Sequence, residues 1–350
     1  MSTTVKMPWE YGAPQVRVRA EAAKPSRGGD DAVPYLLSAD DILREEYPEP
    51  VWAVPGLLPV GLSLLAGRPK RGKSWLALQI AFAVASGGVV LGRKVERGRV
   101  LYLALEDPPR RLQERMLDQG WTEGLSVDFL TAHAFHRTYE NLADADNMSR
   151  FLALIRDARY RLVVIDTFSR SFSVDQNDVQ AVTRALSAVQ EEAGAIQCAV
   201  LLIDHHNKLG NEDAIDAVLG STAKGAIADC IWGLFREQGK AGAKLKVIGR
   251  EVEEQSLALT WDGLTRCWQC EGDADAMEIT NRRKEIMDAL ETLGRSQVGT
   301  IADAIGQPKS HTFSRLQDLC NAGLVCRERV DSKVYYSLKE RSNCNTCNDL

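Results

Sequence analysis

The chain has 350 residues, of which 45% are hydrophobic, and its formal net charge at pH 7 is -5. This length suits one full α/β domain and a small second domain, each with its own core. The charge gives no general indication of nucleic-acid binding, no apolar run approaches the roughly 20 residues that span a bilayer, and the opening MSTTVKMPWEYG lacks the apolar stretch of a signal peptide. Eight cysteines are too few for a secreted disulfide scaffold of this length, so we expect a cytoplasmic protein with reduced thiols.

The N-terminal region divides at about residue 35. Residues 1–35 are rich in Ala, Pro, Gly and charged residues and show no helical or strand period, which predicts a flexible arm. The amphipathic stretch SADDILREEYP follows, and Ser38 with Asp41 three residues later forms a helix-capping signature. We expect a short helix there, at the start of a domain over residues 36–271.

Between Leu57 and Glu271, apolar β-rich runs alternate with helical patterns. The expected strands are residues 62–66, 100–105, 127–131, 162–165, 199–203, 231–235 and 245–248, with an antiparallel pair at 257–261 and 266–270. The expected helices are residues 73–86, 110–119, 148–157 and 179–192. This alternation predicts an α/β domain with a mostly parallel sheet that is covered on both faces.

The C-terminal part predicts a second domain. Residues 272–280 are expected to form a linker, because their first part is short and acidic. Residues 281–341 hold 11 Lys and Arg against 8 Asp and Glu and show three helical patterns followed by strands at 325–329 and 334–338. That order predicts a small winged helix-turn-helix domain, with Phe313, Leu316 and Leu319 inward on its third helix and residues 342–350 as a tail.

The segment GRPKRGKS matches the phosphate-binding pattern G-x-x-x-x-G-K-[ST], with an expected strand before it and an expected helix after it. Gly67 and Gly72 let the backbone curl so that consecutive N–H groups point at an anion, and the following helix dipole adds to that field. Lys73 is expected to reach the β and γ phosphates of ATP, and Ser74 to ligate Mg²⁺. The predicted nucleotide contacts in this segment are Gly67, Arg68, Pro69, Lys70, Arg71, Gly72, Lys73, Ser74 and Trp75.

Polar residues end three other expected strands of the same sheet. Asp166 ends the buried run LVVID and is predicted to be the second Mg²⁺ ligand. Glu106 and Asp107 follow another strand, and Glu106 is the preferred catalytic base because Asp107, just before Pro108, also suits a helix cap. His205 and His206 end a third strand, and we expect them to sense the γ phosphate.

In this order, the segments GRPKRGKS, LYLALED, LVVIDT, LLIDHHNK and LGSTAKGAIAD resemble the RecA-like AAA domain of plasmid and phage RepA-type hexameric replicative helicases, over roughly residues 36–271. The resemblance implies that Glu106 is the catalytic glutamate, that Asp166 is the Walker B aspartate, and that His205 and His206 belong to the family's histidine motif. It also implies an arginine, often with a lysine, that enters the neighbouring subunit's ATP site. Arg250 with Lys246 is the candidate, although Arg250 equally suits a surface arginine paired with Glu251 or Glu253.

A helix-turn-helix presents the exposed N-terminal residues of its third helix to DNA bases. Here those residues are Lys309, Ser310, His311, Thr312, Ser314 and Arg315, while Lys333 on the wing and Arg327 or Arg329 could meet phosphates. Winged helices also serve as protein-docking or oligomer contacts, and this alternative stays open. The pairs Cys267-x-x-Cys270 and Cys344-x-x-Cys347 do not predict a zinc site, because residues three apart in a strand point to opposite faces and the two pairs are widely separated.

Three functions are consistent with these patterns. The leading hypothesis is an ATP-driven motor of the hexameric helicase type, which binds Mg-ATP between the subunits of a ring and moves against single-stranded DNA. The second is an ATP-dependent DNA-binding regulator or loader that uses the winged helix and does not unwind DNA. The third is a recombination-type filament ATPase.

Overall fold

The computed structural model of the chain describes residues 36–175, 178–205, 222–236, 239 and 242–339. They fall into two units, of which the first ends at Glu49 and the second begins at Pro50. In the first unit, α1 (Ala39–Arg44) has the predicted cap, because the Ser38 hydroxyl accepts from the Asp41 amide at 3.1 Å and the Asp41 carboxylate accepts from the Ser38 amide at 3.0 Å. No residue of α1 is buried.

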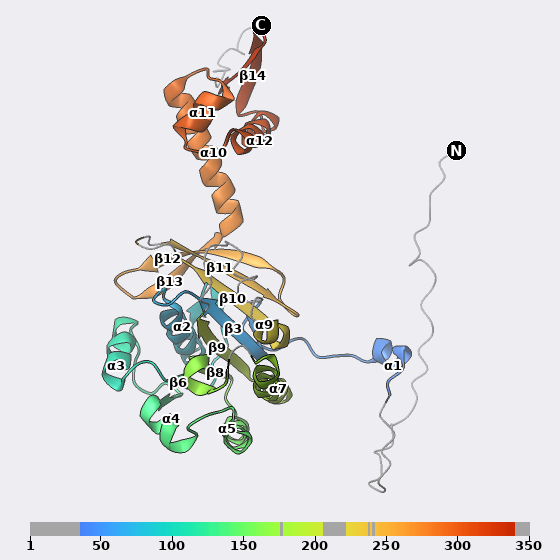
Figure 1. Cartoon of the computed structure of the whole chain (residues 1–350), viewed down its shortest axis with the longest axis vertical. Coiled ribbons are helices and arrows are strands. Elements are labelled where there is room, and N and C mark those ends of the chain that lie inside the picture. Colours follow the sequence, from blue (N-terminus) through green and yellow to red (C-terminus); the bar gives the residue numbers. More distant parts are fainter. Residues whose placement is uncertain (1–35, 176–177, 206–221, 237–238, 240–241, 340–350) are drawn as a thin grey trace, which may run out of the picture. The chain divides into compact units, whose positions relative to one another are not determined.

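The second unit is built on a sheet whose strands lie in the order β13-β12-β11-β10-β3-β9-β8-β6-β7 (Figure 1). The parallel strands are β3 (Gly61–Gly67), β6 (Val100–Ala104), β7 (Val127–Thr131), β8 (Leu162–Asp166), β9 (Ala199–His205) and β10 (Cys230–Phe235). The antiparallel strands are β11 (Gly242–Gly249), β12 (Gln255–Asp262) and β13 (Cys267–Asp273). β3 therefore lies inside the sheet, between β9 and β10.

Helices cover both faces of the parallel strands, as predicted. They are α2 (Lys73–Ser86), α3 (Pro109–Asp118), α4 (Ala132–Thr138), α5 (Ala145–Ala158), α6 (Phe168–Ser171), α7 (Val179–Ala195) and α9 (Thr222–Ile227). Successive side chains of a strand point to opposite faces, so Leu65 packs in the core under α2 while Leu64 packs in the core under α7. The result is a RecA-like P-loop fold with a three-stranded antiparallel extension.

Two further strand pairs flank this sheet. β1 (Trp52–Val54) pairs with β2 (Leu58–Pro59), and β4 (Val89–Val90) pairs with β5 (Arg93–Lys94). The expected elements of the sheet domain are otherwise confirmed, and α2 and β7 have the predicted bounds. The helices α4, α6 and α9 were not predicted, because seven, four and six residues are too short to show a helical period.

The C-terminal residues form three helices and a hairpin around their own core, in the predicted order. The elements are α10 (Ala274–Leu293), α11 (Val298–Ala304), α12 (Lys309–Asn321), β14 (Val325–Val330) and β15 (Lys333–Leu338). Their core is formed by Ile286, Leu290, Ile301, Leu316, Leu319, Val325 and Tyr336. Asp331 and Ser332, with φ of 45° and 66°, make the tight turn between the strands.

Two details of this region differ from the prediction. Residues 272–280 are not an irregular linker, because β13 continues to Asp273 and the Asp273 carboxylate accepts from the Ala276 amide at 2.7 Å, which caps α10. Phe313 is 43% exposed rather than inward. Thr312, 1% exposed, takes the inward position, because Thr312, Leu316 and Leu319 follow the i, i+4, i+7 spacing of one helix face.

The predicted arm, residues 1–35, and the predicted tail, residues 342–350, lie outside the described residues. Within the described ranges, no helix is both long and apolar enough to cross a lipid bilayer.

Candidate nucleotide-binding site

The P-loop connects β3 to α2 and requires glycine at both ends. At Gly67, an added Cβ would lie 2.8 Å from the backbone oxygen of Leu234 in the neighbouring strand β10. Gly72 has a φ of 100°, and an added Cβ would lie 2.8 Å from the Trp268 ring. Both glycines are therefore fixed by close approach, and Gly72 also by a backbone conformation that side chains disfavour.

Gly72→Ala is expected to destabilise the nucleotide-free protein by about 1–2 kcal/mol or more, from the positive φ and the contact with Trp268. Denaturant unfolding measures this loss. The matched control is Gly194→Ala in α7, where an added Cβ meets nothing within 4 Å and alanine is the better helix former. Equal stability of Gly72→Ala and wild type would contradict the assignment of strain to this turn.

Lys73 is buried at the first position of α2 and turns back into the loop. Its Nζ donates to the carbonyl oxygens of Gly67 at 2.7 Å and Arg68 at 3.0 Å, and lies 2.9 Å from Nδ1 of His205. Burial lowers the pKa of Lys73 to about 8, while three nearby carboxylates act in the opposite direction: Asp166, Asp204 and Glu106. An ammonium group that has lost its water in this way is ready to bind an anion.

The other loop residues surround this lysine. Arg68, Pro69 and Lys70 are exposed, and Arg71, Gly72, Ser74 and Trp75 are half-buried. The Trp75 ring packs edge-on against Trp261 at 5.7 Å between centroids, and the Arg115 guanidinium lies 4.9 Å from the Trp75 ring centroid. The side chain of Trp75 is thus engaged with the protein itself.

Asp166 ends β8 and is only 4% exposed. Burial raises the pKa of its carboxyl to about 6, while the Ser74 hydroxyl and the Tyr102 hydroxyl, which donates to Oδ2 at 3.1 Å, act to lower it. The Ser74 hydroxyl is close enough to Asp166 to lower this pKa, but Oδ1 of Asp166 accepts no well-formed hydrogen bond from the described residues. A buried carboxylate oxygen without a donor, next to a hydroxyl, is the oxygen chemistry that Mg²⁺ prefers, so Asp166 and Ser74 fit the predicted metal site.

Glu106 and Asp107, which the sequence left as alternatives, face different neighbours. The Glu106 Oε1 accepts from the Thr167 hydroxyl at 3.0 Å and lies 3.4 Å from Nε2 of His205. Asp107 instead forms ion pairs with Arg111 at 3.3 Å and with Arg115. The structure therefore brings Glu106 to the cluster of Lys73 and His205 and ties Asp107 to α3.

Arg250 lies near the amino end of the parallel strand β10, whereas the P-loop lies at the carboxyl end of its own strand. It follows Gly249, which pairs with Cys230 at the first residue of β10, whereas the P-loop follows the carboxyl end of β3. Its Nη1 donates to Asp229 Oδ1 at 3.1 Å and its Nη2 to the Ala226 carbonyl at 3.0 Å. Its partner is thus Asp229 rather than Glu251 or Glu253, and Arg250 is not part of its own chain's P-loop cluster.

Some of the remaining predicted residues lie within the described residues and others lie outside them. Lys246 lies in β11. His206, Cys344 and Cys347 lie outside the described residues, and Cys267 and Cys270 lie in β13 with free thiols. Of the two predicted sensing histidines, the structure therefore places only His205, between Lys73 and Glu106.

Three residues of this site were missed by sequence reasoning. Tyr102 holds Asp166, Thr167 holds Glu106, and Trp268 donates from its indole Nε1 to the Gly72 carbonyl at 3.3 Å. The alternation of β6 could have placed Tyr102 on the same face as its neighbour Ala104, which is in register with Asp166. No local signal indicates Trp268, because its contact depends on the fold of the antiparallel extension.

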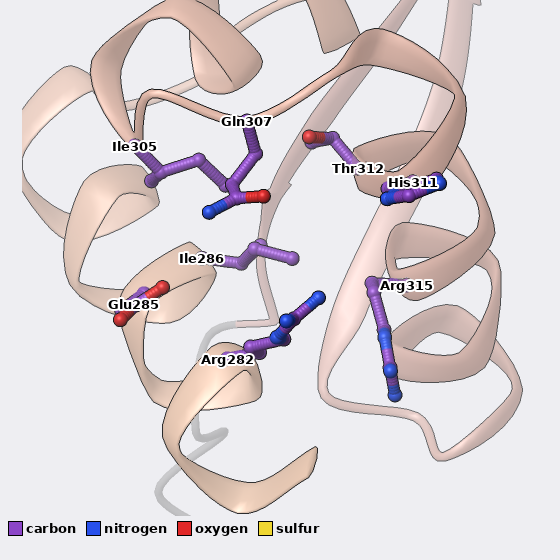
Figure 2. Close-up of a pocket in the computed structure, with 8 residues that line it drawn as sticks. All are labelled: Arg282, Glu285, Ile286, Ile305, Gln307, His311, Thr312 and Arg315. Carbon is purple, nitrogen blue, oxygen red and sulfur yellow. The ribbon is translucent and has the colours of Figure 1, made fainter. Parts of the chain in front are cut away.

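The predicted DNA-contacting residues belong to the C-terminal helices and hairpin. Lys309, Ser310, His311 and Lys333 are exposed, and Arg315 is half-buried. Figure 2 shows Arg315 and His311 of α12 lining one pocket with Arg282 of α10. Glu285, Gln307 and Thr312 also line it, together with Ile286 and Ile305. The pocket brings two guanidinium groups from separate helices to one place.

Comparison with known proteins identifies the family of the chain. A sequence profile described as an AAA domain matches residues 30–211, more than half of the chain. The crystal structure of the RadB recombinase is similar with a TM-score of 0.43 and 16% identity, over 61% of this chain and 91% of that one. The crystal structure of a KaiC-like protein from Pyrococcus horikoshii OT3 is similar with a TM-score of 0.44 and 14% identity, over 63% of this chain and 99% of that one. No curated protein sequence matches.

Proposed function

Because this chain belongs to the AAA domain family, we propose that it is a RecA-like ATPase motor of the hexameric replicative helicase type. The observation that carries the proposal is the meeting of Lys73, Asp166, Glu106 and His205 at the carboxyl edge of the parallel strands. A phosphate-binding loop, a buried metal-binding carboxylate and a second carboxylate for water activation are the parts that hydrolysis of a bound triphosphate needs.

In this proposal the P-loop amides and Lys73 bind the β and γ phosphates. Ser74 and Asp166 hold Mg²⁺, which when bound neutralises charge on the phosphates. Glu106 orients the attacking water and accepts its proton, while Thr167 and His205 hold the Glu106 carboxylate in place.

His205 is well placed to report whether the γ phosphate is present. An ammonium group only donates, so Nδ1 of His205 accepts from Lys73 and the ring proton is on Nε2, which then donates to Glu106. A bound γ phosphate competes for Lys73 and removes the donor to Nδ1. We therefore propose that nucleotide binding shifts the His205 side chain.

Arg250 is our candidate for the residue that acts on the neighbouring subunit's ATP. Its exposed position at the opposite edge from its own P-loop suits a head-to-tail ring, in which one edge of a subunit meets the other edge of the next. A guanidinium group there stabilises charge that develops on the transferred phosphoryl group. Mixing Arg250→Ala subunits with Lys73→Ala subunits tests this. If Arg250 acts on the neighbouring subunit, an Arg250→Ala subunit with an intact P-loop regains hydrolysis beside a Lys73→Ala subunit that supplies its Arg250.

The C-terminal helices and hairpin are proposed to be a winged helix-turn-helix that contacts DNA phosphates. Arg315→Ala and Lys333→Ala are each expected to weaken DNA binding and to reduce the slope of log affinity against log salt by about 1. The control is Arg295→Ala, because Arg295 is already paired with Glu328 at 2.9 Å. An unchanged salt slope in both variants would favour a protein-docking role for this domain.

Strand displacement on forked DNA, with ATP hydrolysis measured alongside, separates the motor from the second candidate function. Hydrolysis that single strands stimulate, together with displacement, supports the motor. Sequence-specific footprinting of duplex DNA without displacement supports an ATP-dependent regulator or loader. Electron microscopy with a non-hydrolysable ATP analogue distinguishes closed rings from the filaments of a recombination-type ATPase.

Asp166→Asn tests how the charge of the Asp166 carboxylate affects the stability of the protein when no metal or nucleotide is bound. Because burial raises the pKa of Asp166 from 3.8 to about 6, the folded protein binds more protons than the unfolded chain between those values and loses stability as the pH rises through them. The variant is therefore expected to be more stable than wild type at pH 7, by up to about 3 kcal/mol, and inactive. Unfolding free energies from pH 4 to 7 should show this difference growing up to about pH 6; a difference independent of pH would contradict the assignment.

A further inference from the structure

Two lysines are buried in the part of the chain that the structure describes, and the proposed mechanism uses only Lys73. The other, Lys224 in α9, is 2% exposed. Its Nζ donates to Asp204 Oδ2 at 2.7 Å and lies 3.9 Å from the centroid of the Phe168 ring. Burying an ammonium group is costly unless it is closely paired, and a buried ion pair adds little net stability compared with apolar packing, so this pair invites a functional explanation.

Asp204 and Phe168, which Lys224 contacts, are both next to residues of the ATP site in the chain. Asp204 immediately precedes His205 at the end of β9, and its carboxylate is close enough to raise the pKa of Lys73. Phe168 immediately follows Thr167 and is completely buried against Phe172. His205 and Thr167 both contact the Glu106 carboxylate. Lys224 therefore contacts Asp204 and Phe168, each of which is next in the chain to a residue that contacts the proposed catalytic base.

Because of the geometry of a strand, the contact between Lys224 and Asp204 also constrains His205. Successive side chains in a strand point to opposite faces, so fixing the Asp204 side chain on one face fixes the rotation of the chain at His205 on the other. His205 is the last described residue of β9 and pairs with Gly67 of β3. The direction of the His205 ring therefore depends on how Asp204, its neighbour in the chain, is held.

We propose that Lys224 is a positioning residue for ATP hydrolysis. By holding Asp204 and Phe168, it sets the directions of His205 and Thr167 and through them the Glu106 carboxylate. This inference rests on the proposed function of the site. Lys224 is not proposed to contact ATP. Replacing Lys224 should therefore slow the chemical step and leave nucleotide binding nearly unchanged.

The first test compares Lys224→Met with Lys224→Arg. Lys224→Met is expected to lower kcat by about 10- to 100-fold, the effect of a small misplacement of a reacting group, with a nearly unchanged affinity for a non-hydrolysable ATP analogue in calorimetry. Lys224→Arg keeps the charge and should restore part of kcat. The matched control is Lys244→Met, which removes another Lys–Asp pair, with Asp275, on β11; it should hydrolyse ATP at the wild-type rate.

A double-mutant cycle separates the loss of positioning from a loss of folded protein. Lys224→Met leaves the Asp204 carboxylate without its cation, which destabilises the folded protein. Combining Lys224→Met with Asp204→Asn removes both charges and avoids this destabilisation. If Lys224 acts through Asp204, the double variant should be no slower than the slower single variant. Thermal unfolding of all four proteins shows whether kcat falls in molecules that are still folded.

The outcomes separate this inference from the function on which it rests. A folded Lys224→Met protein with wild-type kcat, or additive effects of the two substitutions, overturns the inference while leaving the ATPase site intact. A kcat that falls only in proportion to unfolded protein also overturns it. Absence of hydrolysis by the wild type, with or without single-stranded DNA, overturns the proposed function instead.

Discussion

Lys73→Ala should abolish measurable ATP turnover, with a loss in kcat/KM of about 10³-fold or more. Lys73 supplies a buried positive charge to the P-loop, and no other described lysine lies in that loop's interior. The charge is needed more in the transition state than in the bound triphosphate, so both nucleotide affinity and kcat should fall. Steady-state phosphate release, with calorimetry for nucleotide affinity, measures the two effects.

The stability of the Lys73→Ala protein should not fall with its activity. Burial lowers the pKa of Lys73, which means that the folded protein bears a cost for keeping this group charged. Lys94→Ala is the matched control, because Lys94 also donates to a glycine carbonyl, that of Gly87 at 2.7 Å, but on the surface. Turnover that persists in folded Lys73→Ala would show that the phosphate site has been misassigned.

Glu106→Gln is expected to lower kcat by about 10²- to 10⁴-fold while leaving ATP binding in place. The amide oxygen of glutamine can still accept from the Thr167 hydroxyl, so the geometry is kept and only the ability to take a proton is lost. Single-turnover hydrolysis with excess enzyme isolates this step from nucleotide exchange.

Asp107→Asn should produce the opposite pattern. Asp107 is paired with Arg111 and Arg115, so its neutralisation should weaken the start of α3 and reduce thermal stability, with a smaller effect on hydrolysis. If Asp107→Asn instead stops hydrolysis and Glu106→Gln does not, the roles of these neighbours must be exchanged, and the site around His205 loses its proposed base.

The P-loop and the acidic strand ends could be predicted from the sequence because they depend on residues that lie close together in the chain. Gly67, Gly72, Lys73 and Ser74 lie within eight consecutive residues, and the loop they form needs only a strand before it and a helix after it. The apolar run before Asp166 identifies a buried parallel strand, and parallel strands deliver their last residues to one edge. The same reasoning found α12 but chose the wrong inward residue, since Phe313 and Thr312 both satisfy part of a helical period.

Only the tertiary structure decided which of these residues meet. The choice between Glu106 and Asp107 depends on the direction in which the chain leaves β6, and the arginines of α3 settle where Asp107 lies. Tyr102, Thr167, Trp268 and Lys224 join the site through contacts between segments far apart in the chain. Hydrophobic period reports which face of an element is buried but carries no information about the order of strands in the sheet. That order, with β9 inserted between β3 and β8, is what brings His205 between Lys73 and Glu106.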